Sequence, residues 1–230
     1  MCGRYRLTAW QQRLVEHFDA DPPEHYEASY NIAPSQTVPI IRRVGTRRCF
    51  AAARWGLVPG WSRDKTFGGY STINARAETV TTKPAFRSAF RHRRCLIPAD
   101  GYYEWQVVPG SKRKQPWCIA LRDDEPFAFA GLWEHWEGAD GECLESCCII
   151  VTVANETTKP IHDRMPVILD RADWDVWLDP AVQSAERVQA LLRPYDCAPM
   201  RVWRVDTWVN NPRNAGPRCS AHLETGAVDR

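Results

Sequence analysis

The stretch RCLIPADGYYEWQV, residues 94–107, decides the fold class of this chain. Two short runs of aliphatic and aromatic residues flank the dipeptide Asp100-Gly101, which favours a tight turn. This arrangement predicts two neighbouring β-strands. Side chains alternate between the two faces of a strand, so Glu104 is expected on the opposite face from Tyr103 and Trp105.

Outward from this stretch, the chain contains further short runs of strand-like composition, separated by turn signals that include glycine. These runs are VPIIRR (38–43), RCFAAARW (48–55), WCIALR (117–122), FAFAGLW (127–133) and CCIIVTV (147–153). Many short strands at such spacing are typical of a sandwich or a barrel. The core is therefore expected to be rich in β-structure.

Helical patterns are confined to three segments. Thr8 and Gln11 have the spacing of a capping box, and apolar residues follow at helical spacing, which predicts a helix over about residues 8–18. Two later helices are expected over 171–178 and 182–193. The predicted fold class is α+β, with a β-rich core, barrel-like or built of mixed sheets, and flanking helices.

The length of 230 residues is sufficient for one ample core. We see no repeat, no low-complexity block and no internal boundary. One domain is therefore expected over residues 1–216. Apolar periodicity is lost near the end, so residues 217–230 are expected to form a flexible tail.

Composition excludes several classes of protein. Hydrophobic residues make up 44% and charged residues 25%, and 30 basic against 28 acidic residues give a net charge of +2, which by itself does not indicate nucleic acid. No secretory or membrane-spanning run is found, so a cytoplasmic location is expected. The nine cysteines are expected to be reduced thiols, because no secretory signal is found. Cys143, Cys147 and Cys148 are clustered, but no second CxxC or histidine pair completes a zinc site. We expect no metal and no cofactor.

Several motifs are more specific than composition requires. They are MCGRY (1–5), YNIAP (30–34), WGLVPGW (55–61), STINARAET (71–79), ADGYYEW (99–105), IHDRMPVIL (161–169) and VNNPRN (209–214). In this order, and over nearly the whole chain, they resemble the SOS response-associated peptidase (SRAP) family. The resemblance implies a β-rich core with a positively charged groove. It also implies crosslinking of the N-terminal cysteine to abasic sites in single-stranded DNA, as part of the response to DNA damage.

Cys2 carries the chemistry that this resemblance implies. A cysteine side chain is small, so trimming of Met1 is plausible and exposes both an amine and a thiol on one residue. Their reference pKa values are about 8 and about 8.5, so both nucleophiles are partly available near neutral pH. The amine takes the aldehyde of an opened abasic sugar as an imine, and the thiol closes a five-membered thiazolidine. An internal cysteine has no free amine, so the position is essential.

Three further residues match catalytic positions of the family. Partial burial of Glu104 is expected to raise its pKa and suit it to proton transfer between the amine and the aldehyde oxygen. His162, in a turn with prolines on both sides, is expected to donate a proton to the sugar ring oxygen. Asn74 offers an amide that both donates and accepts hydrogen bonds, so it suits orientation of the amine or sugar hydroxyl.

DNA contacts are expected from a separate set of residues. Arg4 and Arg76 are predicted to hold flanking phosphates, because a guanidinium binds phosphate oxygens in a fork. Trp61 is predicted to stack on a base, and Phe86 or Pro34 to fill the gap where a base is missing. These assignments give single-stranded DNA with abasic sites as the partner of a protein expected to be monomeric.

Basic clusters are expected to extend this DNA contact. Arg91–Arg94 follows the NAR segment closely enough to line the same groove, whereas Lys112–Lys114 has the composition of a hairpin tip. We therefore expect DNA contact from the first cluster before the second.

Two alternative functions, besides crosslinking, remain open from the sequence alone. The family name suggests a cysteine peptidase that removes its own Met1 or cleaves other substrates, with Cys2 as nucleophile and Glu104 or His162 as base. A lyase-type activity is compatible with the same site. The third reading is a single-stranded DNA-binding module with no covalent step, in which substitution of Cys2 leaves DNA retention unchanged.

Overall fold

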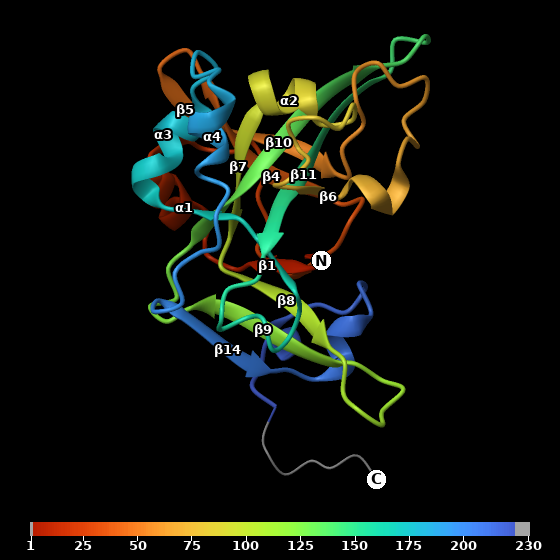
Figure 1. Ribbon diagram of the computed structural model, residues 1–230, viewed down its shortest axis with the longest axis vertical. Helices are drawn as coiled ribbons and strands as arrows, with labels where there is room; N and C mark the ends of the chain where they lie inside the picture. The colour runs from red at the N-terminus through yellow and green to blue at the C-terminus, as the bar shows by residue number, and fades with distance from the viewer. Residues whose placement is uncertain (1, 224–230) are drawn as a thin grey trace.

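The computed structural model describes residues 2–223, except for the side chain of Tyr70. Its strands form two sheets (Figure 1). The smaller sheet has the order β14-β9-β8-β1-β3. Its strands are β1 (Tyr5–Leu7), β3 (Ser29–Ile32), β8 (Gly101–Gln106), β9 (Gln115–Leu121) and β14 (Met200–Arg204).

The larger sheet closes into a barrel. Its central strands have the order β11-β10-β7-β4-β5, and β5 also pairs with β11 in parallel, which completes the ring. These strands are β4 (Thr37–Val44), β5 (Arg47–Trp55), β7 (Arg94–Ala99), β10 (Phe127–Glu137) and β11 (Cys143–Val153). Short strands extend the ring, namely β2 (Ala20–Asp21), β6 (Asn74–Arg76), β12 (Arg164–Pro166) and β13 (Ile168–Leu169). The predicted α+β class with a β-rich, barrel-like core is confirmed.

Strand β1 joins the two sheets. In Figure 1 it lies between the barrel and strands β8, β9 and β14. The ring of Tyr5 contacts Trp55 at a centroid distance of 5.2 Å and Phe129 at 5.8 Å, and both partners belong to the barrel. Tyr102 of β8 contacts the same Phe129 ring at 6.0 Å. One hydrophobic core therefore holds the start of the chain between the sheets.

All seven strands predicted from composition are present, and β7 has the predicted limits. The strands that the sequence analysis missed are two to five residues long. Runs this short carry too little alternation to be recognised, and their pairing partners define them. For example, β6 becomes a strand because Asn74 and its neighbours pair with Ile149–Val151.

The first helix begins later than predicted. Helix α1 covers Gln11–Phe18, and Trp10 is its N-cap residue, with no capping side-chain bond. The backbone N–H and hydroxyl of Thr8 both bind the carboxylate of Asp100 instead. The capping box therefore does not form, because Thr8, the predicted cap residue, is bonded to Asp100, which is distant in the sequence.

The other helices are short and lie outside the barrel. They are α2 (Arg87–His92), α3 (Trp174–Leu178), α4 (Ala185–Gln189) and four 3-10 turns at Gly69–Thr72, Arg171–Asp173, Thr207–Asn210 and Pro217–Cys219. The predicted segment 171–178 is present as a 3-10 turn followed by α3. The predicted segment 182–193 is helical only in α4, and α2 was not predicted. Helices α1, α3 and α4 gather at one side of the barrel (Figure 1).

The chain remains ordered past residue 216, contrary to prediction. Cys219 is fully buried in a second core cluster, and the carbonyl of Ser220 accepts a hydrogen bond from the Trp203 indole at 2.8 Å. The imidazole of His222 stacks on the same indole. Residues 217–223 therefore close the outer face of the small sheet, and the rest of the predicted tail, 224–230, lies outside the described residues.

Arg94 has a structural role rather than the predicted DNA contact. It is 4% exposed, and its guanidinium donates to five carbonyl oxygens, those of Phe90, Arg91, Trp177, Asp179 and Val182. These bonds use every donor that an arginine has. The side chain fastens α2 and α3 to the barrel, so it is not available to a phosphate.

Replacing Arg94 with lysine is expected to destabilise the fold. An ammonium has three donors and a different geometry, so buried carbonyls lose their partners at a total cost of about 3 kcal/mol. The melting temperature should fall by roughly 6–12 °C, measured by thermal denaturation. The control is Arg87→Lys on exposed α2, which should melt with the wild type. An unchanged melting temperature for Arg94→Lys would contradict this role.

Candidate active site

Cys2 lies at the junction of the two sheets. It is fully buried, and its carbonyl oxygen accepts a 2.8 Å hydrogen bond from the Asn74 side-chain amide. Three residues further on, Tyr5 pairs with Ile32 on one side and Tyr102 on the other. The start of the chain is therefore fixed by a side chain as well as by strand pairing.

Asn74 is the first residue of β6. Pairing of β6 with β11 aligns Asn74 with Ile149 and leaves the side chain 7% exposed. Its amide nitrogen binds Cys2, whereas its Oδ1 atom is buried and has no hydrogen-bond partner within residues 2–223. A buried acceptor without a donor is costly, so this oxygen is suited to accept from a group that joins the site.

Glu104 is the titratable group that faces Cys2. It is 3% exposed, on the face of β8 opposite to Tyr103 and Trp105, which belong to the second core cluster, as alternation predicts. Burial raises the pKa of Glu104 to about 7. Burial also raises the pKa of the Cys2 thiol, and the Glu104 carboxylate raises it further. Near neutral pH the site therefore combines a protonated thiol with a carboxylate ready to accept a proton.

His162 lies in the loop between β11 and β12. Its Nδ1 atom accepts a hydrogen bond from the backbone N–H of Arg164 at 3.0 Å, and burial lowers the pKa of the ring. Nδ1 also lies 2.9 Å from the Asp163 carboxylate, a contact that only a protonated Nδ1 makes attractive. The lowered pKa favours the neutral ring, so its proton is on Nε2, which becomes the donor.

The loop that carries His162 is tied to the hairpin of Glu104. The side-chain amide of Gln106 donates to the carbonyl oxygen of Pro160 at 2.9 Å. The charge of Lys114, on the same β8–β9 hairpin, partly offsets the effect of burial that raises the pKa of Glu104, and it adds to the effect of burial that lowers the pKa of His162. Within the cluster Arg91–Arg94, the structure contradicts the predicted DNA contact only for Arg94, whose donors are all bonded to carbonyls. Arg93 forms a bidentate pair with Glu134.

A pocket of about 400 Å³, called here the Cys2 pocket, is lined by Gly3 and Arg4, the two residues that follow Cys2. Its lining residues are Gly3, Arg4, Ala33, Pro34, Gln36, Ile73, Pro212 and Arg213. Pro34 thus lines this pocket together with Gly3 and Arg4. Two chain segments distant in the sequence, YNIAP and VNNPRN, meet there.

Arg4 lines this pocket, but it also holds the wall together. Its Nη1 atom donates to Asn31 Oδ1 and to the Val209 carbonyl, each at 2.8 Å. The Asn31 amide in turn donates to the carbonyls of Asn211 and Asn214 at 3.0 and 2.8 Å. Sequence analysis missed this role of Asn31, whose only signal was its place inside the YNIAP motif. The predicted phosphate contact of Arg4 competes with these bonds.

The other predicted DNA contacts differ in exposure. Trp61 is 58% exposed, with its ring edge-on to Phe67, and is accessible to a base. Arg76 is exposed at the end of β6, two residues from Asn74. Phe86, however, is 4% exposed and packs in the hydrophobic core, so it does not fill an abasic gap in this conformation.

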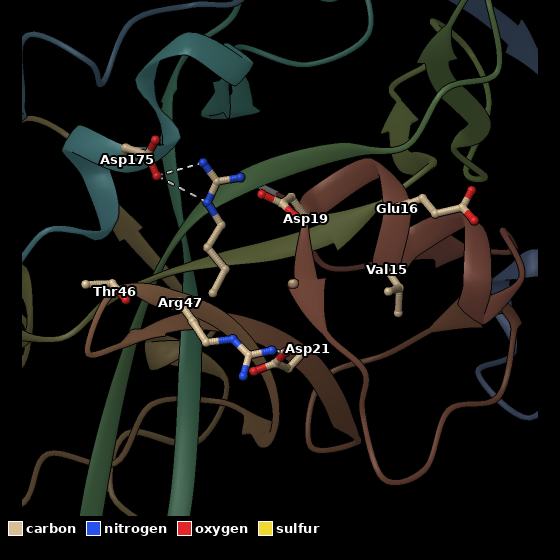
Figure 2. A pocket seen from close by; sticks show the side chains of 9 residues that line it. Val15, Glu16, Asp19, Asp21, Thr46, Arg47 and Asp175 are labelled. Carbon is tan, nitrogen blue, oxygen red and sulfur yellow. Dashed lines mark hydrogen bonds and ion pairs between the residues drawn. The ribbon is translucent and has the colours of Figure 1, made fainter.

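Two other hollows lie away from Cys2. One, of about 520 Å³, is lined by charged residues that pair with one another: Arg47 reaches Asp21, and Asp175 accepts from Arg48 at 2.7 Å (Figure 2). The other, of about 930 Å³, shares Gln36 with the Cys2 pocket.

Within the described residues, no cluster of side chains could hold a metal ion, and no helix is long and apolar enough to cross a membrane. All nine cysteines are free thiols. Among the polar side chains near Cys2, Asn74 bonds to its carbonyl and Glu104 acts on its thiol through charge.

Comparison with known proteins gives a consistent result. The family model described as SOS response associated peptidase (SRAP) matches residues 1–212. The abasic site processing protein YoaM of Bacillus subtilis is 45% identical over 217 residues, covering 93% of this chain and 95% of the relative. The mouse abasic site processing protein HMCES is 30% identical over 255 residues, covering 95% of this chain and 69% of its own length.

Solved structures share the fold. A crystal structure of a Bacteroides thetaiotaomicron protein superimposes with a TM-score of 0.86 at 26% identity, covering 97% of this chain and all of the other. A Bordetella bronchiseptica protein gives a TM-score of 0.77 at 28% identity, covering 89% of this chain and all of the other.

Proposed function

This chain belongs to the SRAP family, and from that premise we propose that it processes abasic sites by covalent capture. After removal of Met1, Cys2 forms a thiazolidine with the aldehyde of an abasic site in single-stranded DNA. The product shields the lesion from cleavage. The names of the relatives support abasic sites as the target.

One observation carries the proposal. Cys2 is held by Asn74 beside Glu104, the buried carboxylate whose pKa is raised to about 7. A second-residue cysteine with only a packing role needs neither an amide on its carbonyl nor a buried carboxylate next to its thiol. This arrangement suits a reaction in which both the amine and the thiol of Cys2 lose protons.

The reaction balances in two steps. The amine nitrogen attacks the aldehyde carbon, two protons leave the nitrogen, and the aldehyde oxygen leaves as water, which gives an imine. The thiol then adds across the C=N bond, with sulfur bonding to carbon and its proton ending on nitrogen. The second step is intramolecular, and such steps reach effective molarities of about 10⁵–10⁸ M when well oriented. The closed ring lacks the imine that promotes β-elimination.

The four polar residues have separate roles in these steps. The Glu104 carboxylate takes a proton from the amine and returns it to the departing oxygen. The Nε2–H of His162 donates a hydrogen bond to the sugar ring oxygen while the closed sugar opens to the aldehyde. Asn74 keeps Cys2 in place through its amide nitrogen and accepts from the freed amine through Oδ1.

The DNA path follows the pocket beside Cys2. Pro34 lies at the position of the missing base, and Arg213 and Arg76 hold phosphates on either side. Trp61 stacks on a neighbouring base, a contact worth about 1–3 kcal/mol. Arg4 contributes to the same wall. Phe86 is left out because it is buried, and Lys114 takes the place of the Arg91–Arg94 cluster.

The experiment that tests this function uses a single-stranded oligonucleotide with one abasic site. Purified protein, with Met1 removal checked by intact mass, is incubated with this DNA and analysed on a denaturing gel. A retarded band is expected, and it should be absent with the same oligonucleotide carrying an intact base. No band from protein that has lost Met1 would reject covalent capture.

Reversible binding is expected to weaken as salt rises. If three phosphates are contacted, affinity for single-stranded DNA should fall roughly 10- to 20-fold between 50 and 200 mM salt. Arg213→Ala should reduce the slope of log affinity against log salt by about 0.7, as measured by fluorescence anisotropy. The control is Arg193→Ala, because Arg193 is already paired with Asp170. Equal slopes for all three proteins would remove Arg213 from the path.

One observation supports the alternative peptidase function. The Glu104 carboxylate acts on Cys2, the residue whose peptide bond to Met1 would be cleaved. Self-removal of Met1 would be compatible with covalent capture, since it creates the required amine. Cell-free synthesis without aminopeptidase, followed by intact mass, distinguishes the two routes. Loss of Met1 that depends on Cys2 and Glu104 would assign an autopeptidase activity.

A further inference from the structure

Two buried phenols have no use in the reaction described so far. Tyr5 and Tyr102 are both fully buried, and neither hydroxyl has a hydrogen-bond partner within residues 2–223. A buried hydroxyl without a partner is unfavourable, whereas phenylalanine would fill the same space at no such cost. These hydroxyls are therefore candidates for a role that begins when the site reacts.

Register places Tyr102 nearest to the reacting groups. Tyr102 and Glu104 are two residues apart on β8, so their side chains are on the same face of the strand. Opposite Tyr102 in the ladder is Tyr5, three residues after Cys2. Burial has the largest effect on the pKa of the Tyr102 hydroxyl and raises it, and the charges of Cys2 and Glu104 have the next largest effects.

Tyr5 is the weaker candidate. Its ring is enclosed by the barrel residues Trp55 and Phe129, and after burial the charge that acts most on its hydroxyl is that of Cys147 of β11. Tyr5 is thus enclosed by two barrel rings, whereas Tyr102 shares its strand face with Glu104.

We propose that the Tyr102 hydroxyl donates a hydrogen bond to the Cys2 sulfur during closure of the thiazolidine ring. This inference rests on the proposed function. Negative charge develops on sulfur as its proton leaves and the C–S bond forms. In a site without water access, a fixed O–H donor stabilises that charge, which burial otherwise disfavours. No atom is transferred from Tyr102, because the thiol proton ends on the ring nitrogen.

If the Tyr102 hydroxyl has this role, its loss should slow only one of the two chemical steps. Imine formation uses the amine and Glu104, so it should not depend on Tyr102. Ring closure uses the thiol, so it should be slower without the hydroxyl, by about ten- to a hundredfold, as expected for a lost hydrogen bond to a charged group. A purely structural role would affect both steps alike.

The test compares Tyr102→Phe with wild type on single-stranded abasic DNA. Samples are quenched at intervals with or without borohydride, and adducts are measured by denaturing gel and intact mass. Borohydride adds two hydrogen atoms to an imine and none to a thiazolidine, so the two products are distinguished by mass. Tyr102→Phe should accumulate the imine, which borohydride reduces, and should form the thiazolidine more slowly than the wild type.

Tyr103→Phe is the matched control. The Tyr103 hydroxyl donates to the Tyr30 carbonyl at 2.8 Å on the other face of β8. Its loss should lower the melting temperature and leave ring closure at the wild-type rate, whereas Tyr102→Phe should melt at or above the wild-type temperature. Wild-type ring closure in Tyr102→Phe, or equal slowing of both steps, would overturn the inference alone. A wild type that forms no adduct would overturn the proposed function and this inference with it.

Discussion

Cys2→Ser is expected to form no adduct that survives denaturation, while its reversible binding to single-stranded DNA stays near the wild-type level. Serine keeps the amine but lacks a thiol, so the imine cannot close to a thiazolidine and is hydrolysed. Binding should persist because phosphate contacts come from arginines around the pocket and not from the thiol. Denaturing gels measure the adduct, and fluorescence anisotropy measures the binding.

A borohydride arm separates the two nucleophiles of Cys2. Reduction should trap an imine adduct of Cys2→Ser, provided that Met1 has been removed, since the amine is unchanged. The control is Cys143→Ser, because Cys143 is an exposed free thiol and the non-specific candidate for reaction. Cys143→Ser should crosslink like the wild type. A stable adduct from Cys2→Ser without borohydride would exclude the thiazolidine.

Glu104→Gln is expected to lower the rate of adduct formation by about 10²–10⁴-fold, the usual effect of losing a positioned acid–base group. Because the pKa of Glu104 is raised to about 7, the wild-type rate should increase with pH through this value as the carboxylate becomes ionised. The variant should lose that part of the pH dependence. Single-turnover rates between about pH 5.5 and 8.5 provide the measurement.

The same substitution is expected to stabilise the protein above neutral pH. In the folded state the raised pKa lets Glu104 keep its proton up to about pH 7, whereas an exposed glutamate has a pKa of about 4.5. The folded state therefore binds more protons in this interval, and its stability falls as pH rises. The penalty is on the order of 3 kcal/mol once the carboxylate is ionised, and Gln removes it. Below pH 4.5 the difference should vanish.

Glu134→Gln is the control for both effects. Glu134 is also 3% exposed, but it forms a bidentate pair with Arg93. Its substitution breaks a partly buried ion pair, so it should destabilise the fold without changing the pH profile of the reaction. Loss of rate with an unchanged pH profile in Glu104→Gln would reject Glu104 as the proton-transfer group.

The barrel was predictable from sequence because its strands are long enough to carry their own signal. The run at 94–99 is buried along its whole length, and its limits agree with β7. Predictions of structure from the local sequence failed where a contact with a residue distant in the sequence determines the local structure. Thr8 has the pattern of a helix cap but is captured by Asp100, and residues 217–223 have no apolar periodicity yet cover the Trp203 indole.

Candidate site residues could be named from the sequence, but their arrangement could not be predicted. Cys2 precedes β1, Asn74 begins β6 and Glu104 lies in β8, and only tertiary pairing brings these segments together. The Asn74 amide bonds to the Cys2 carbonyl, and the charge of Glu104 acts on the Cys2 thiol. Side-chain direction could not be predicted for the basic clusters. Arg94 lies in a segment with the composition of a charged surface, but its five carbonyl partners lie in α2 and in the distant stretch 177–182, and nothing in the local sequence indicates the second of these.

The most direct test of covalent capture by Cys2 is to locate the crosslink. Protein whose loss of Met1 has been confirmed is reacted with a short single-stranded oligonucleotide that carries one abasic site, then digested and analysed by tandem mass spectrometry without reduction. The account predicts one modified peptide, beginning with Cys2, with the mass of peptide plus DNA fragment minus one water and no free amine or thiol. A modified lysine or another cysteine, with Cys2 unmodified, would contradict it.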